Sequence, residues 1–139
     1  MTTEEKDILF KDLCGRLPYG VICDLWMCKN PNEKITEVLK FGGLRMFHED
    51  HINFNIKPYL RPMADMTEKE YETFPIPFSF DSFSTWNNTI LSEVIEGTQI
   101  LIGIDEITEI IDWLNAHHFD YRSLIEKGLA LEAPEGMYN

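Results

Sequence analysis

The chain contains no long apolar run, and this absence excludes a membrane-spanning class of protein. No stretch of its 139 residues approaches the roughly 18 consecutive apolar residues that a transmembrane helix needs. Its first residues, Met1 to Lys6, are polar and acidic, which is the reverse of a secretory signal peptide. We therefore expect a cytoplasmic protein with no membrane partner.

Cysteine is also scarce. The three cysteines, Cys14, Cys23 and Cys28, include no C-x-x-C pair, and their odd number argues against a disulfide framework. Because an unpaired cysteine is among the most buried residue types, we expect buried free thiols.

Positive charge is nearly absent from the second half of the chain. Residues 63–139 carry fifteen acidic and three basic side chains, whereas residues 1–62 carry nine of each, so the net charge of −12 belongs to the second half. Nucleic-acid binding needs Lys and Arg at the phosphates, and we therefore expect no nucleic-acid partner. The acidic half either faces solvent or attracts a basic partner.

Signatures of catalysis are missing as well. No G-x-S-x-G sequence and no glycine-rich phosphate loop occurs, and Gly42-Gly43 is typical of a turn. The sequence therefore favours a protein without enzymatic activity and without a cofactor.

Helices are predicted from capping boxes and from apolar spacing. The capping boxes are Thr2 with Glu5, before a helix over 2–17, and Thr67 with Glu70, before a helix over 68–73. From Ile104, apolar residues recur at i, i+3, i+4 and i+7 as far as Leu114, which predicts a long amphipathic helix. A polar and aromatic corner at 115–122 follows, and then a second short helix that ends at Gly128.

Strands are predicted mainly in the first half. The candidates are 21–28, 34–41 (which forms a hairpin with the first), 44–47, 52–56 and, in the second half, 98–102. Two prolines exclude 57–62 from helices and from central strands. These elements predict one α+β domain over residues 1–139. It would contain a small antiparallel or mixed sheet of four to five strands, an N-terminal helix and a C-terminal helix pair.

Three segments resemble an uncharacterised family of short proteins from gut anaerobic bacteria, their phages and other mobile elements. They are residues 12–21, residues 57–63 with 66–68, and residues 113–131 apart from Ser123, together roughly a third of the chain. The resemblance implies a mobile-element context. It brings no activity, cofactor or catalytic residue.

The histidines fall in two clusters that contain ligand-type side chains. A loop could bring His48 and His51 together with His117 or Asp120 to form a metal site. The alternative is structural: His117 and His118 end the long helix and bond its last carbonyl groups, while Asp120 caps the next helix.

Two further groups are candidates for binding. The segment 74–86 is rich in aromatic residues that anchor interfaces as readily as they fill cores: Phe74, Phe78, Phe80, Phe83 and Trp86. A second group contains Arg16, Lys57 and Arg61 near Tyr19 and Tyr59. It either binds an anion or a peptide, or covers the edge of the core.

The leading hypothesis is a small non-enzymatic adaptor or regulator, encoded by a mobile element, that contacts an unknown protein partner; self-association is left open. One alternative is a metal-binding protein or metal-dependent hydrolase that uses the histidine clusters. A second alternative is an acidic mimic of DNA, against which the neutral first half counts.

Overall fold

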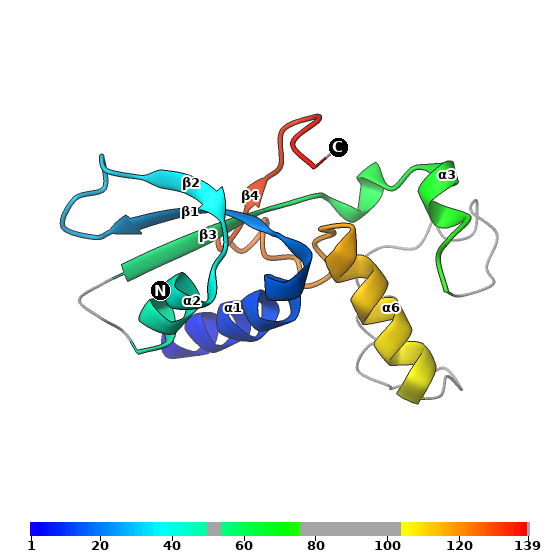
Figure 1. Cartoon of the computed structure of the whole chain (residues 1–139), viewed down its shortest axis with the longest axis horizontal. Coiled ribbons are helices and arrows are strands. Elements are labelled where there is room, and N and C mark those ends of the chain that lie inside the picture. Colours follow the sequence, from blue (N-terminus) through cyan, green and yellow to red (C-terminus); the bar gives the residue numbers. More distant parts are fainter. Residues whose placement is uncertain (50–53, 76–103, 139) are drawn as a thin grey trace. The chain divides into compact units, whose positions relative to one another are not determined.

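The computed structural model describes residues 1–49, 54–75 and 104–138 (Figure 1). They form two compact units. The first unit contains the described residues up to Leu60 and those from Leu124 onward, and the second runs from Arg61 to Ser123. The expectation of a single domain over residues 1–139 stays a prediction. None of the described helices is long and apolar enough to cross a membrane.

A four-stranded mixed sheet forms the centre of the first unit (Figure 1). Strand β1 (Ile22–Met27) pairs antiparallel with β2 (Ile35–Val38) and with β3 (Phe54–Leu60). Strand β4 (Leu131–Glu132) pairs with β3 in parallel, which gives the order β2-β1-β3-β4. The predicted α+β class, the small mixed sheet and the hairpin of its first two strands are confirmed.

Two helices cover one face of this sheet. Helix α1 (Thr3–Arg16) begins with the predicted capping box of Thr2 and Glu5, and a 3-10 turn, η1 (Leu17–Tyr19), follows it. Helix α2 (Phe41–His48) lies beside α1 (Figure 1). The buried core of this unit includes Leu9, Leu13, Val21, Cys23, Leu25, Leu39, Leu44, Phe47, Ile56, Leu60, Leu124, Leu129 and Ala130.

The strand predicted at 44–47 is wrong, since these residues belong to α2. Leu44 and Phe47 are three residues apart, so both point from one side of the helix into the core. Gly43 also lies inside α2, where an added Cβ would come within 3.2 Å of the Leu25 side chain. Gly43 therefore permits a close approach of helix to strand, and the pair Gly42-Gly43 lies within α2 instead of forming a turn.

The exclusion of residues 57–62 from a central strand is also wrong. β3 lies between β1 and β4 and contains Lys57 to Leu60, including Pro58. Its pairing with β1 ends at Cys23↔Pro58, and its pairing with β4 begins at Tyr59. Pro58 thus has a partner strand on one side only within the described sheet, which is why its missing N–H is tolerated.

The second unit contains η2 (Met63–Asp65), α3 (Glu68–Tyr71) and α6 (Ile104–Ala116). The capping box of Thr67 and Glu70 and the long helix from Ile104 are confirmed. The core of this unit consists of Met66, Tyr71, Phe74, Ile110, Leu114, Phe119 and Tyr121.

The predicted C-terminal helix pair is only half correct. Residues 121–128 form turns, so α6 has no helical partner there and Asp120 caps no helix. Ser123 has a left-handed φ of 57°, which interrupts any helix at that point, and Gly128 ends the turn with φ 74°. The chain then enters β4.

The three cysteines are free, but only Cys23 is buried, whereas Cys14 and Cys28 are exposed. The expected burial is therefore correct for one thiol and wrong for two. The buried face of α1 runs through Leu9, Asp12, Leu13 and Arg16, so Cys14 lies outside it.

Candidate functional site

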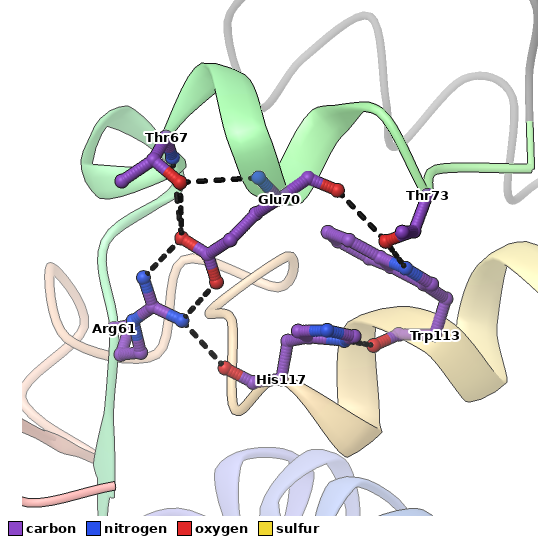
Figure 2. A network of polar contacts seen from close by, with 6 residues as sticks. All are labelled: Arg61, Thr67, Glu70, Thr73, Trp113 and His117. Atoms are coloured by element: carbon purple, nitrogen blue, oxygen red, sulfur yellow. Dashed lines mark hydrogen bonds and ion pairs between the residues drawn. The ribbon is translucent and has the colours of Figure 1, made fainter. Parts of the chain in front are cut away.

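A polar network in the second unit holds the segment around α3 against the end of α6 (Figure 2). Arg61 donates from Nη1 and Nη2 to the two carboxylate oxygens of Glu70, each at 2.7 Å. The Thr67 hydroxyl and backbone N–H donate to the same carboxylate at 3.1 and 3.2 Å. Hydrogen bonds from Arg61 are the main cause that lowers the pKa of Glu70 from 4.5 to about 2.

The network continues to the long helix. Trp113 donates from its indole nitrogen to the Thr73 hydroxyl at 3.0 Å, and Thr73 donates to the Glu70 carbonyl at 2.9 Å (Figure 2). His117 stacks on Trp113 with ring centroids 4.0 Å apart, and its Nδ1 lies 2.8 Å from the Trp113 carbonyl. Since a carbonyl can only accept, Nδ1 is the donor in this hydrogen bond.

The end of α6 has a left-handed residue that is not glycine. His118 has φ 63°, and its N–H bonds the Asn115 carbonyl while the Phe119 N–H bonds the Leu114 carbonyl. This pair of bonds defines a Schellman motif, in which glycine usually occupies the position of His118. The prediction that the two histidines end the helix is confirmed.

The aromatic interaction candidates have only one member in the described residues. Phe74 is buried, with its ring against Tyr71 and, edge to face, against Trp113 at 5.0 Å. That environment is typical of a core residue. Phe78, Phe80, Phe83 and Trp86 lie outside the described residues, and their role stays a prediction.

The metal candidates are divided between the two units. His48 stacks on Phe10 at 4.4 Å in the first unit, while His117 and Asp120 belong to the second, and His51 lies outside the described residues. Asp120 donates its backbone N–H to the Arg61 carbonyl at 2.8 Å. Among the described residues, no group of three or more His, Cys, Asp or Glu side chains could hold a metal ion.

The basic and aromatic group predicted from sequence is also divided. Arg16 is completely buried on α1 and binds Asp12 through two hydrogen bonds of 2.6 and 3.1 Å. Arg61 is bound by Glu70 and lies over the Phe119 ring at 4.3 Å. Lys57 and Tyr59 remain together on β3, on the face opposite Ile56 and Leu60, which pack in the core with residues of α1 and α2.

We call that face the outer face; the strand register arranges its side chains in rows. One row holds Thr36, Asp24 and Lys57, and the next holds Trp26 and Asn55, with Lys34 just before the start of β2. Asp24 is only 6% exposed, and its carboxylate accepts from the Thr36 hydroxyl at 2.6 Å and from the Tyr59 hydroxyl at 3.0 Å. The Lys34 ammonium lies over the Trp26 ring, 5.0 Å from its centroid.

Exposed apolar side chains lie along the edge of the same sheet. β2 is an edge strand in the described sheet, with Ile35 60% and Val38 47% exposed, and Phe41 at the start of α2 is 69% exposed. We call Ile35, Val38 and Phe41 the apolar edge.

Comparison with known proteins adds no relative: no family model, no curated protein and no solved structure matches the chain. The resemblance to mobile-element proteins therefore stays a prediction.

Sequence reasoning missed the apolar edge, and of the outer face it named only Lys57 and Tyr59. The outer face is indicated in the sequence by polar and aromatic residues two positions apart, because such residues share a face of a strand. They are Asp24 and Trp26 on β1, and Lys57 and Tyr59 on β3. For the apolar edge, no signal distinguishes exposed Ile35 and Val38 from buried strand residues until the strand order is known.

Proposed function

We propose that this chain is a small cytoplasmic adaptor or regulator of mobile-element origin, without enzymatic activity, that acts by contacting another protein. The observation that carries the proposal is the apolar edge. Scattered apolar residues are normal at a surface, but here two of them lie on one edge strand, on its opposite faces, and a third begins the next helix. Edge strands and exposed aromatic side chains are common sites of protein contact.

A second copy of the chain is a less favourable partner than a different protein. The net charge of −12 opposes close approach of two identical chains. Glu37 also lies exposed in the middle of β2, where a charge discourages edge-to-edge pairing. Both features leave the apolar edge to a partner with another sequence.

Photo-crosslinking in the native host tests this proposal. A photoreactive phenylalanine analogue replaces Phe41, and in a control protein it replaces Lys127, which is exposed in a turn. We expect a discrete protein adduct from position 41 and none from position 127. Equal labelling from both positions, or no adduct at position 41, contradicts the proposal.

The adduct also identifies a partner for measurement with purified proteins. Phe41→Ser should then weaken binding by about tenfold, the effect of losing an interface anchor, while Lys127→Ser should leave it unchanged. Circular dichroism of Phe41→Ser should match the parent chain, since the side chain is mostly exposed. Unchanged affinity in a folded Phe41→Ser variant contradicts a role of the apolar edge in binding.

A further inference from the structure

The outer face is positively charged although the chain as a whole is strongly acidic. Its one acidic residue, Asp24, is buried and already accepts two hydroxyl hydrogen bonds. Lys34 is exposed over the Trp26 ring, and Lys57 is half-buried on β3, opposite Asp24. Within the described part of the chain neither lysine forms an ion pair. Two ammonium groups therefore set the sign of the charge presented to a ligand.

Aromatic and hydrogen-bonding groups accompany these lysines. Trp26 and Tyr59 are both half-buried, so part of each ring remains accessible, and Asn55 stands opposite Trp26 in the register. Trp26 already accepts a cation on its ring, from Lys34. A carboxylate that meets Lys34 would thus find the ammonium group held in place, at a reduced cost in side-chain entropy.

We infer that the outer face binds an acidic, extended segment of the partner protein, through Lys34 and Lys57 on either side of Trp26. This inference rests on the proposed function, because it names the chemistry of the partner that the adaptor contacts. Charge complementarity with the two lysines selects carboxylates. The Trp26 ring selects an apolar side chain between them.

The register sets the spacing of the two carboxylates. Extending the β1–β2 register by one residue places Lys34 opposite Trp26, so Lys34 and Lys57 lie two strands and one row apart, about 12 Å between their backbones. An extended peptide spans that distance in about four residues. The preferred segment therefore has two acidic residues about four positions apart, with an apolar residue between.

A nucleic acid fits the same face less well. Its affinity comes from many phosphate contacts, each needing a cation, and this face offers two lysines on a chain of net charge −12. A segment with two carboxylates matches the number of cations available. Tighter binding of an oligonucleotide than of an acidic peptide would reveal nucleic-acid binding instead.

The test is a titration of the full isotope-labelled chain followed by nuclear magnetic resonance. The probe is a short synthetic peptide with two glutamates about four positions apart around a leucine. We expect shifts of the Trp26 indole and the Lys57 amide, weakened by added salt. A matched peptide with glutamines in place of the glutamates should give no such shifts. Binding of both peptides alike overturns the inference.

Variants test the two lysines separately. Lys34→Gln and Lys57→Gln should each lower the affinity for the glutamate peptide by about two- to fivefold, and Lys57→Glu should lower it more strongly. Lys127→Gln should leave this affinity unchanged. The spectra of these surface variants report directly that the fold is kept. An unchanged affinity in both lysine variants overturns the inference, and so does tighter binding of a single-stranded oligothymidine than of the peptide.

The inference that the outer face binds an acidic segment can fail independently of the proposed function. If adducts form at position 41 but the glutamate peptide does not bind, the adaptor stands and the acidic segment is rejected. If the peptide binds to the outer face but position 41 yields no adduct, the peptide chemistry stands and the apolar edge is rejected as the contact surface.

Discussion

The Tyr138 hydroxyl donates a hydrogen bond of 2.6 Å to the backbone carbonyl of Tyr59, where the pairing of two strands stops. The β1–β3 register ends at Cys23↔Pro58, so the next opposed pair would be Ile22 and Tyr59. The same hydroxyl accepts from the Ile22 N–H at 2.9 Å. One side chain thus bridges the two backbone groups, and burial raises the pKa of Tyr138 to about 12, which keeps the bridging proton in place.

Tyr138→Phe should lower the free energy of unfolding by about 1–2 kcal/mol, because it leaves a backbone donor and acceptor without their shared partner. Urea denaturation measures the loss, and faster hydrogen exchange at the Ile22 amide locates it. Tyr19→Phe is the control, since that phenol is exposed and should change stability by less than about 0.5 kcal/mol. Equal stability of both variants would show that the bridge contributes nothing.

Asp12 and Arg16 form a completely buried ion pair, so removing either charge should be costly. Arg16→Met should destabilise the protein by about 3–5 kcal/mol, because it leaves the Asp12 carboxylate buried without its cation. The double variant Asp12→Leu with Arg16→Met should recover much of that loss. The matched control is Arg45→Gln in the exposed pair Arg45–Glu49, expected to cost less than about 1 kcal/mol. Additive losses in the double variant would contradict this coupling.

The thiols should react in two classes. Cys14 and Cys28 are exposed, whereas burial raises the pKa of the Cys23 thiol to about 12. Because the thiolate is the nucleophile, a maleimide should label the first two in the native protein and Cys23 only after denaturation. Mass spectrometry of the labelled peptides measures this. Fast native labelling of Cys23 would contradict its position in the core.

Leu114 is completely buried in the core of the second unit, as the apolar spacing of the long helix predicted. Leu114→Ala should cost about 2–5 kcal/mol, and a thermal melt measures the loss. Asp112→Ala serves as the control, because Asp112 is exposed on the same helix. A melt unchanged by Leu114→Ala would contradict the packing of α6.

Local signals in the sequence predicted those features that depend on a few neighbouring residues. Thr2 with Glu5 and Thr67 with Glu70 satisfy backbone groups within one turn, so both capping boxes appear where expected. The β1–β2 hairpin follows from two apolar runs joined by the turn at Asn30 to Asn32. These features need no knowledge of the rest of the fold.

Features that depend on distant partners were not predictable in the same way. Leu44 and Phe47 fit either a short strand or one side of a helix, and only the core beneath α2 selects the helix. Asp12 and Arg16 have the i, i+4 spacing of an ordinary surface pair, and their burial depends on the sheet that packs over them. The outer face likewise exists only once three strands are in register.

The Arg61–Glu70 pair should make stability depend on pH in acid. The pKa of Glu70 is lowered from 4.5 to about 2, so its ionised form stabilises the folded state. That contribution is fully present above pH 4.5 and is lost as the pH falls towards 2, because the carboxylate is then protonated. Glu70→Gln should therefore destabilise the protein by about 1–2 kcal/mol at neutral pH, with a difference that shrinks across this acid range. Urea denaturation at several pH values measures this difference.

The control is Glu72→Gln, which changes an exposed glutamate two residues further on and should follow the parent chain at every pH. A Glu70→Gln difference that stays constant from neutral pH down to 2 would show that the ion pair does not stabilise the fold.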